Sequence, residues 1–233
     1  MSTQGRMDRG SAQLLARKEG AIGWIVFNNP GRRNAVSMAM CRALLDVARA
    51  FSADPGLRLV IVSGAGERAF SAGADISEFE AKRATAAAIA EYDGLAEEAS
   101  RALEHMAKPT IAMIRGYCIG GGLDLALRCD IRIAGDDARF GIPAARLGLG
   151  YAASDVNRLV DIVGPAFAKE IFYSGRQFSA AEALAMRLVN RVVPVCDLES
   201  AVRDEAETIT RNAPHAIAAL KRPVTEAPAP RGA

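Results

Sequence analysis

The chain has 233 residues, of which 50% are hydrophobic and 24% charged, and its formal net charge is +2. A chain of this length and composition is expected to form one large globular domain with a buried core. Its basic and acidic residues are interleaved, which excludes the basic surface typical of proteins that bind nucleic acid. No stretch of about 18 apolar residues predicts a membrane helix. We therefore expect neither a nucleic acid nor a membrane as partner.

The N-terminus is polar and lacks the apolar segment of a signal peptide, which favours a cytoplasmic protein. Four cysteines lie far apart in the sequence and form no C-x-x-C pair, so we expect reduced, buried thiols. The two histidines, His105 and His215, are isolated from each other. A metal site would need an unusual set of carboxylates alone, and we predict none.

Apolar runs and turn-forming residues predict strands and helices that alternate along the chain. Residues 1–13 are expected to form a flexible leader. Strands are predicted at 21–29, 57–64, 110–116 and 130–135, and helices at 37–51, 84–106, 123–129, 154–164, 166–175, 179–187 and 197–212. The segment 188–193 is short and apolar. The segment 116–122 is expected to be a turn. This alternation predicts an α/β architecture with a mainly parallel sheet.

Three domain boundaries follow from this pattern. Residues 14–195 are expected to form the α/β core, and residues 196–222 a short helical segment. Residues 223–233 contain three prolines and are predicted to be a disordered tail.

Two stretches of small residues are candidates for binding an anion. Gly120, Gly121 and Gly122 follow a buried strand and precede a short helix, whose first N–H groups have no partner within the helix. The stretch "FSAGAD", residues 70–75, also follows a strand. Two such N–H donors converging on one point would polarise a carbonyl oxygen. A tight turn that only needs positive φ explains the glycines about equally well.

A dinucleotide site is a weaker alternative. Gly64, Gly66 and Ala69 follow a buried strand with the spacing of a dinucleotide fingerprint. The next residues are again a small-residue loop and not the helix that a pyrophosphate requires. We therefore do not expect an NAD-dependent oxidoreductase.

The stretches "AFSAGADISEF" and "KPTIAMIRGYCIGGGLDLALRCDIRIAGDDARFGIP" resemble the enoyl-CoA hydratase/isomerase (crotonase) superfamily in order and spacing. The resemblance extends over residues 14–222. It implies a spiral of repeated ββα units, an acyl-CoA thioester as substrate, no other cofactor, and assembly as a homotrimer or hexamer. It also implies that the chain lacks part of the C-terminal helical region of the family.

The resemblance also implies roles for individual residues. The backbone N–H groups of Ala74 and Gly121 would hold the thioester oxygen. Coenzyme A would contact Arg32, Arg33, Ala35, Ala72, Gly73, Ala74, Asp75, Ile76 and Gly120. For the two arginines, a solvated basic turn is an equally good interpretation.

The sequence departs from the family at both positions where hydratases carry a catalytic glutamate. Asp124 occupies the first position and Ala144 the second, which would face the pocket. Asp124 lies in the first turn of a predicted helix, where the helix dipole favours the ionised carboxylate. It is the best candidate for a catalytic acid or base. Ala144 cannot transfer a proton, so efficient two-carboxylate hydration is disfavoured.

Tyr151 and Asp155 are candidates to replace the missing carboxylate. We expect Asp155 to cap a helix and the Tyr151 ring to pack in the core, although its hydroxyl could also face the pocket. The chain is therefore predicted to be an acyl-CoA enzyme of hydratase, isomerase or decarboxylase type that stabilises a thioester enolate. The alternative is a catalytically weak acyl-CoA-binding protein with the same fold.

Overall fold

The computed structural model of the chain describes residues 13–75 and 85–226. In this part of the chain the strands form two sheets. The larger has the order β1-β2-β3-β5-β7-β10 and the smaller the order β4-β6-β8-β9. The larger sheet is built from Leu14–Glu19 (β1), Ile22–Phe27 (β2), Leu59–Gly64 (β3), Thr110–Ile114 (β5), Ile131–Gly135 (β7) and Arg191–Val193 (β10). The smaller is built from Ala69–Ser71 (β4), Tyr117–Ile119 (β6), Arg139–Gly141 (β8) and Phe178–Ser179 (β9).

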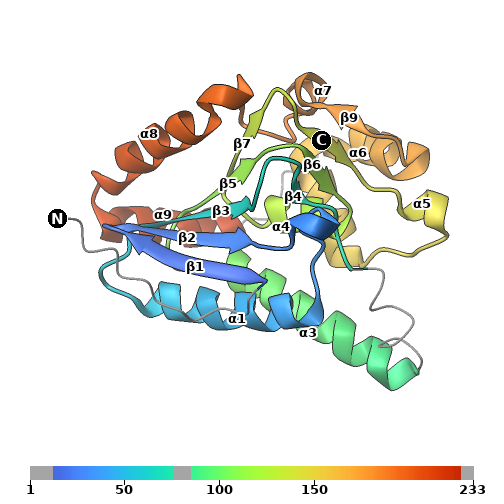
Figure 1. The fold of residues 1–233 in the computed structure, drawn as a ribbon, viewed down its shortest axis with the longest axis horizontal. Coiled ribbons are helices and arrows are strands. Elements are labelled where there is room, and N and C mark those ends of the chain that lie inside the picture. The colour runs from blue at the N-terminus through green and yellow to red at the C-terminus, as the bar shows by residue number, and fades with distance from the viewer. Residues whose placement is uncertain (1–12, 76–84, 227–233) are drawn as a thin grey trace.

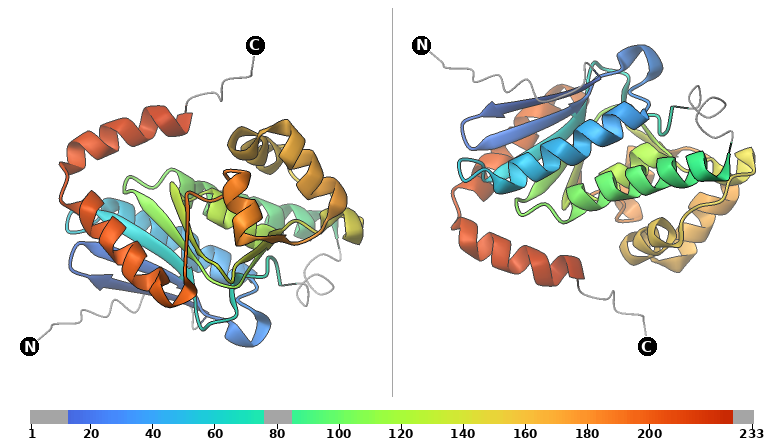
Figure 2. Two further views of the ribbon diagram at one scale, coloured as in Figure 1. Left: turned by 90° about the horizontal axis from the view of Figure 1, so that it is seen from above. Right: turned by 90° about the horizontal axis from the view of Figure 1, so that it is seen from below.

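The helices lie between and after the strands. They are Met38–Ala53 (α1), Ala86–Glu104 (α3), Gly121–Leu127 (α4), Ala144–Leu147 (α5), Ala153–Ser174 (α6), Ala180–Ala185 (α7), Leu198–Thr210 (α8) and Pro214–Glu226 (α9). Short 3-10 turns cover Pro30–Arg32 and Val195–Asp197. Figure 1 shows the larger sheet between α8 on one face and α1 with α3 on the other, and Figure 2 shows α1 and α3 side by side.

The chain repeats one unit of two strands and a helix. β3 and β4 precede α3, β5 and β6 precede α4, and β7 and β8 precede α5. In each unit the first strand joins the larger sheet and the second joins the smaller one, with parallel pairing between successive units. The predicted α/β spiral of ββα units with a C-terminal helical part is confirmed.

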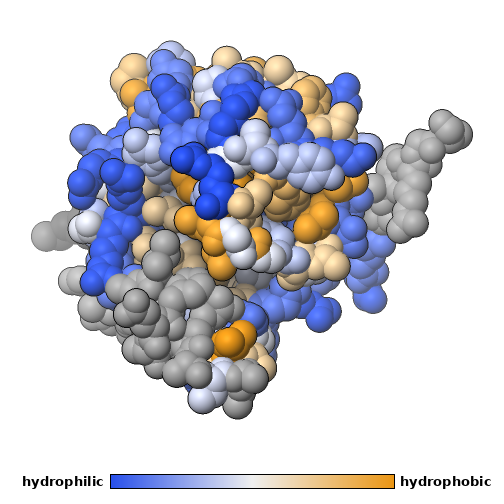
Figure 3. All heavy atoms as spheres, turned by 90° about the vertical axis from the view of Figure 1, so that its right-hand side faces the viewer, coloured by the Kyte–Doolittle hydropathy of each residue, from blue (hydrophilic) through white to orange (hydrophobic). Residues whose placement is uncertain are grey.

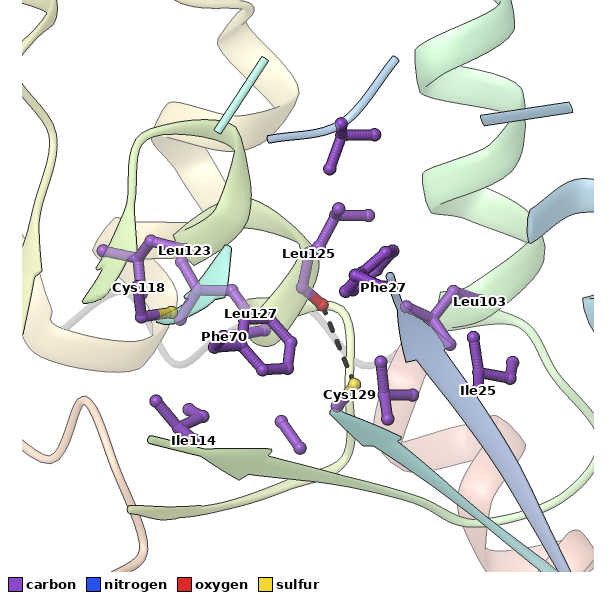
Figure 4. Packing of buried hydrophobic residues seen from close by; sticks show 14 of the residues in the cluster. Ile25, Phe27, Phe70, Leu103, Ile114, Cys118, Leu123, Leu125, Leu127 and Cys129 are labelled. Carbon is purple, nitrogen blue, oxygen red and sulfur yellow. Dashed lines mark hydrogen bonds between the residues drawn. The ribbon is translucent and has the colours of Figure 1, made fainter. Parts of the chain in front are cut away.

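Apolar residues fill both faces of the larger sheet. Trp24, Leu59 and Ile61 pack against Leu198 and Val202 of α8 in one buried cluster. The other and larger cluster lies between the two sheets and α1, α3 and α4. Figure 4 shows Leu123, Leu125 and Leu127 of α4 in this cluster near Phe27, Phe70 and Ile114. The leucines anchor α4 and thereby fix the position of the glycines at its start.

Local signals predicted most element boundaries well. Ser37 caps α1 by accepting a hydrogen bond from Met40 N, and Ser179 and Glu182 form the predicted capping box of α7. The two helices predicted at 154–164 and 166–175 correspond to the two halves of α6, which are separated by a kink at Gly164, where the backbone is not helical (φ 77°, ψ 164°). Asp197 precedes α8 but its side chain makes no cap hydrogen bond.

Several predictions were wrong in detail. The segment 116–122 is not only a turn, since it contains β6. Strands β1, β4, β8, β9 and β10 were not predicted, because most of them are only two or three residues long. The C-terminal tail does not begin at residue 223, since α9 continues through Pro223 to Glu226. Of the four cysteines, Cys196 is exposed and the other three are buried, all as free thiols.

Two terminal predictions concern residues that are mostly outside the described ranges. Of the leader predicted at residues 1–13, only Gln13 is described, and its carbonyl accepts a hydrogen bond of 2.7 Å from Asn28 N. Of the predicted tail, residues 227–233 lie outside the described residues.

Candidate active site

The glycine run at the start of α4 has a separate structural reason at each position. Gly120 has φ 55° and ψ −127°, which a residue with a side chain rarely adopts. A Cβ on Gly122 would lie 2.4 Å from the backbone oxygen of Ser71 at the end of β4. A Cβ on Gly121 would meet only ordinary contacts, the nearest being Ala74 N at 3.7 Å. Packing against β4 therefore explains Gly122, whereas Gly121 leaves space beside the Ala74 amide.

The loop that carries Ala74 is held in place by the segment before α1. Val36 N donates to Gly73 O at 2.7 Å, and Asp75 N donates to Val36 O at 2.9 Å. Since the neighbours of Ala74 make both bonds of this parallel bridge, the N–H of Ala74 itself points away from Val36. No described residue accepts a hydrogen bond from the N–H of Ala74 or of Gly121 through its backbone carbonyl. The N–H groups of Ala74 and Gly121 are therefore available to donate hydrogen bonds to a ligand.

Ala74 and Gly121 both line a cavity of about 500 Å³. Its walls come from the loop at Ala74, from α1, α3 and α4, and from the segment that leads into α6. The lining residues are Val36, Cys41, Leu44, Ala74, Tyr92, Asp93, Ala96, Glu97, Ala99, Ser100, Gly121, Asp124, Leu125, Gly150, Tyr151, Ala152, Ser154 and Asp155. The side toward α1 is apolar, whereas α3 and the start of α6 contribute acids, serines and a tyrosine hydroxyl.

Asp124 and Tyr151 form a hydrogen-bonded pair in this cavity. The Tyr151 hydroxyl donates to Asp124 Oδ2 at 2.7 Å, while the Tyr151 ring packs edge-on against Phe172. Asp124 Oδ1 is buried and has no hydrogen-bond partner among the described residues. Burial raises the pKa of Asp124 from 3.8 to about 8, although the hydrogen bond from Tyr151 acts in the opposite direction. Asp124 is therefore mostly protonated at pH 7.

This protonation contradicts the prediction that the helix dipole keeps Asp124 ionised. α4 has only seven residues, and its dipole acts against the loss of water around a buried carboxylate. The loss of hydration is the larger effect here. The hydroxyl of Tyr151 also faces the cavity, so that residue both packs its ring and presents its polar end.

A group of charged side chains lies beyond Asp124, and two of them, Glu97 and Asp155, line the cavity. Arg128, one turn further along α4, is buried and donates to Asp155 Oδ1 at 2.5 Å and Glu104 Oε2 at 2.6 Å. It also approaches Glu97 Oε2 at 3.3 Å. Arg158 of α6 pairs with the other oxygen of Glu104. The prediction that Asp155 caps a helix is wrong, since its carboxylate binds Arg128 and α6 has no side-chain cap.

Residues 32–35 of the loop before α1 do not line the cavity, although Val36 does, and this loop lies against the Ala74 loop. Arg32 pairs with the buried carboxylate of Asp75 at 2.8 Å. Arg33 stacks its guanidinium on the Tyr117 ring, 4.8 Å from the centroid, and its carbonyl accepts from Ala72 N at 2.9 Å. The charge of Arg32 thus acts within the protein, while its side chain remains 55% exposed.

The structure gathers five of the residues predicted for the site around one cavity: Ala74, Gly121, Asp124, Tyr151 and Asp155. Other predicted residues do not line it, namely Arg32, Arg33, Ala35, Ala72, Gly73, Asp75, Gly120 and Ala144. Ala144, expected to face the pocket, is instead packed in the core as the first residue of α5. Ile76 lies outside the described residues.

Sequence reasoning missed the contribution of α3. Tyr92, Ala96, Ala99 and Ser100 line the cavity together with Asp93 and Glu97. Their spacing of three and four residues is that of one helix face, which was the available signal. The ion pairs of Arg128 had no such signal, because their partners lie 24 to 31 residues away in the chain.

The surface around α5 is partly apolar. In Figure 3, which shows the right-hand side of Figure 1, apolar residues gather near the centre of the face and hydrophilic ones surround them. Leu147 and Leu149, at the end of α5 and just beyond it, are 55% and 49% exposed. The next residues, Gly150 to Ala152, line the cavity, so this apolar surface continues toward the candidate site along the chain.

The described residues show neither a membrane-spanning helix nor a metal-binding cluster. No helix in residues 13–75 and 85–226 is long and apolar enough to cross a membrane. The same ranges contain no group of three or more His, Cys, Asp or Glu side chains suited to hold a metal ion.

Comparison with known proteins identifies relatives over nearly the whole chain. A family model described as enoyl-CoA hydratase/isomerase matches residues 17–231. The chain is 35% identical to a short-chain-enoyl-CoA hydratase of Clostridium acetobutylicum over 91% of its own length and 80% of the relative's. It is 38% identical to a carnitinyl-CoA dehydratase of Proteus mirabilis, over 91% of this chain and 79% of that one.

Solved structures agree with these matches. A crystal structure of an enoyl-CoA hydratase/carnithine racemase from Magnetospirillum magneticum superposes with a TM-score of 0.90 at 37% identity. The match covers 92% of this chain and 80% of that one. An enoyl-CoA hydratase from Bacillus anthracis superposes with a TM-score of 0.88 at 32% identity, covering 92% and 83% of the two chains. Sequence and fold together show that this chain is an enzyme of the enoyl-CoA hydratase/isomerase family.

Proposed function

We propose that this enzyme moves a double bond in an enoyl-CoA thioester by transferring one proton between two carbons. The thioester oxygen accepts hydrogen bonds from the N–H groups of Ala74 and Gly121. These two donors stabilise the negative charge that develops on the oxygen when a proton leaves the neighbouring carbon. Each donor of this kind typically contributes about a hundredfold to a thousandfold in rate.

Asp124 carries the proton. In its ionised form it takes a proton from C2 of a 3-enoyl thioester, and the electron pair of that C–H bond delocalises onto the thioester oxygen. The protonated carboxyl then returns the proton to C4, and the double bond is left between C2 and C3. A single group with a pKa of about 8 can perform both halves of this transfer near neutral pH, since it is easily protonated and deprotonated there.

The observation that carries this proposal is the state of the Asp124 carboxyl. One oxygen is bound by Tyr151, while the other is buried in the cavity without a described partner, in the same cavity as the two amides. The second carboxylate of the hydratases is replaced by Ala144, which is packed in the core. An isomerisation needs only one proton carrier, whereas addition of water requires a second group to activate the water.

Hydration, or the reverse dehydration, is the second candidate. Relatives that share 35% and 38% identity with this chain are named as a hydratase and a dehydratase. In this reaction the water oxygen would bond to C3 while the water gives its proton to ionised Asp124, which would then protonate C2 of the enolate. The Tyr151 hydroxyl would orient the water. The rate should be low because Tyr151 remains protonated and cannot take the proton of the water: burial, with a smaller effect of the neighbouring Asp124 carboxyl, raises the pKa of its hydroxyl.

A substrate panel separates these possibilities. We would incubate the protein in D2O with 3-enoyl-CoA, 2-enoyl-CoA, dienoyl-CoA and malonyl-type CoA thioesters and follow products and deuterium by mass spectrometry. The proposal predicts conversion of 3-enoyl- to 2-enoyl-CoA. Net hydration as the main product supports the second candidate, and carbon dioxide release a decarboxylase. Binding without turnover of any thioester would contradict an enzymatic function and favour an acyl-CoA-binding protein.

Coenzyme A would lie along the loops at residues 32–35 and 72–76, with Gly120 beside them, without a metal or any other cofactor. The protein would act in the cytoplasm as a homotrimer or hexamer, for which the exposed apolar residues Leu220 (67%) and Val224 (74%) of α9 offer a contact surface. Light scattering coupled to size-exclusion chromatography measures this assembly, and a monomer would contradict it.

A further inference from the structure

The segment that carries Tyr151 has little apolar packing to hold it in place. Residues 145–158, all of which the structure describes, include no buried side chain, and residues 145–150 and 152–154 are exposed. The half-buried ring of Tyr151 reaches the large core cluster, where it packs edge-on against Phe172. α6 also begins without a side-chain cap. A helix start with so few buried contacts opens readily unless another interaction fixes it.

Two polar interactions, one helical turn apart, join this segment to α4. The Tyr151 hydroxyl donates to Asp124 Oδ2 at 2.7 Å, and Arg128 Nη2 donates to Asp155 Oδ1 at 2.5 Å. Asp124 and Arg128 are four residues apart on α4, a spacing that places them on one helix face, and Tyr151 and Asp155 have the same spacing where α6 begins. Because the leucines of α4 are packed in the core, the ion pair joins an exposed helix start to a fixed helix.

The guanidinium of Arg128 is itself held in one position. Its side chain is 3% exposed, and Nη1 donates to Glu104 Oε2 at the end of α3 at 2.6 Å, so that one side chain connects α3, α4 and α6. Charge-assisted hydrogen bonds of this length hold a planar guanidinium in a defined orientation. Arg158 also pairs with Glu104, but it lies beside the buried Leu159, two turns beyond Tyr151. Arg128 is therefore the arginine that holds the first turn of α6.

We propose that Arg128 and Asp155 are positioning residues: their ion pair holds the start of α6 against α4 and thereby keeps the Tyr151 hydroxyl on Asp124. With Oδ2 bound by Tyr151, the other carboxyl oxygen, which has no described hydrogen-bond partner, is left for the substrate. Asp155 lines the cavity, but Arg128 engages its carboxylate, so its effect on turnover passes through Tyr151. That effect rests on the proposed function of Asp124, whereas the placement of Tyr151 does not.

Hydrogen–deuterium exchange tests this placement without any turnover. The N–H groups of Asp155 and Val156 donate to the carbonyl of Ala152 and close the first turn of α6. Asp155→Ala removes the contact with Arg128, while Glu104 still covers the guanidinium charge, so we expect the variant to fold. The amides of the first turn of α6 should exchange at least tenfold faster than in the wild type, and those of α4 at the wild-type rate. Unchanged exchange at the start of α6 would overturn the inference.

A double-mutant cycle tests whether Asp155 acts through Tyr151. With a 3-enoyl-CoA at pH 7, we expect Asp155→Ala and Tyr151→Phe each to lower kcat at least fivefold and to leave KM within twofold of the wild type. The double variant should be no slower than Tyr151→Phe alone, because no hydroxyl is then left for Asp155 to place. Effects that multiply, or a raised KM with an unchanged kcat in Asp155→Ala, would overturn the inference.

Two further variants complete the test. Asp155→Glu keeps a carboxylate for Arg128 and should retain the slow exchange and most of the wild-type kcat. Glu170→Gln removes a carboxylate that pairs with Arg176 in the second half of α6 and does not line the cavity, so it should change neither quantity. If it acts like Asp155→Ala, the inference is overturned. Should the wild type turn over no thioester, the proposed function fails, while faster exchange in Asp155→Ala would still support the placement of Tyr151.

Discussion

Asp124 illustrates how a single residue depends on its surroundings. Its neighbours in the sequence are leucines, which continue α4 and pack in the core. The carboxyl is thereby held at a cavity wall where one oxygen is buried and the other is bound by Tyr151. Its protonation is determined by loss of water and not by its position in the helix. The chemistry of the site therefore depends on a property that the residue type alone does not reveal.

The pH dependence of the reaction follows from this residue. A base must be ionised, so kcat/KM for isomerisation should increase with pH up to about 8 and then level off, as Asp124 loses its proton. Initial rates with a 3-enoyl-CoA between pH 5.5 and 9.5 measure this profile. Asp124→Asn should lower turnover by about a hundredfold or more with little change in thioester affinity. An unaltered turnover in this variant would assign Asp124 a structural role only.

Tyr151 also affects the pH dependence of kcat/KM. Its hydroxyl lowers the pKa of Asp124 by donating a hydrogen bond to the carboxylate, against the larger effect of burial. Tyr151→Phe retains the ring that packs on Phe172 but removes the donor. The rising limb of the pH profile should therefore move to higher pH, by about one unit for an interaction of about 1.4 kcal/mol. If Tyr151→Phe lowers kcat but the rising limb of the pH profile stays at the same pH, Tyr151 contacts the substrate and does not alter the pKa of Asp124.

At the scale of elements, the site depends on how β4 and its following loop meet α4. Three short strands, β4, β6 and β8, pair in the smaller sheet, and each of the first two ends close to one of the two amides. Gly122 allows the start of α4 to touch the end of β4, because any side chain there would overlap the Ser71 backbone. Close packing of these elements thus determines the separation of the amides.

Two glycine variants distinguish packing from chemistry. Gly121→Ala adds a methyl group that meets only ordinary contacts but lies 3.7 Å from Ala74 N, in the space where a thioester oxygen would bind. We expect near-wild-type thermal stability and a loss of turnover of about a hundredfold. Gly122→Ala places its methyl 2.4 Å from Ser71 O and should destabilise the fold by about 1–3 kcal/mol. Full activity of Gly121→Ala would contradict the role of its amide.

For the whole molecule, the two sheets and the helices around them create a cavity whose walls come from distant parts of the sequence. α3 and the start of α6 approach α4 from different sides, and the ion pairs of Arg128 join all three. Because the paired charges are largely buried, removing one partner costs more than removing an exposed ion pair. The same packing that forms the cavity keeps water from Asp124.

The stability of the whole protein should therefore depend on pH through Asp124. Its pKa is about 8 in the folded protein and near 3.8 when exposed, so the folded state binds one more proton between these values. The free energy of unfolding should decrease as pH rises from about 4 to about 8, by up to about 1.4 kcal/mol per pH unit from this group. Urea unfolding of the wild type and of Asp124→Asn at several pH values isolates the contribution of Asp124, since the two proteins have all other titratable groups in common. Parallel curves for the two proteins would contradict the raised pKa.

The sequence by itself determined the features that depend on near neighbours. The hydroxyl of Ser37, the Ser179 and Glu182 capping box and the continuous apolar run of β3 are local signals, and the structure has them where they were predicted. The pairing of small-residue loops also predicted the family, and with it the spiral of ββα units. The caps and the apolar run follow from hydrogen bonds and periodicity within a few residues of the chain, whereas the spiral was implied by the resemblance to the family.

Only the tertiary structure decided the chemistry around the cavity. Asp155 binds Arg128 and does not cap α6, Ala144 is packed in the core, and Asp124 is mostly neutral at pH 7. Each of these outcomes depends on groups that are distant in the sequence and on how much water remains beside them. Burial and ion pairing act through space, so a pattern of residues along the chain does not contain them.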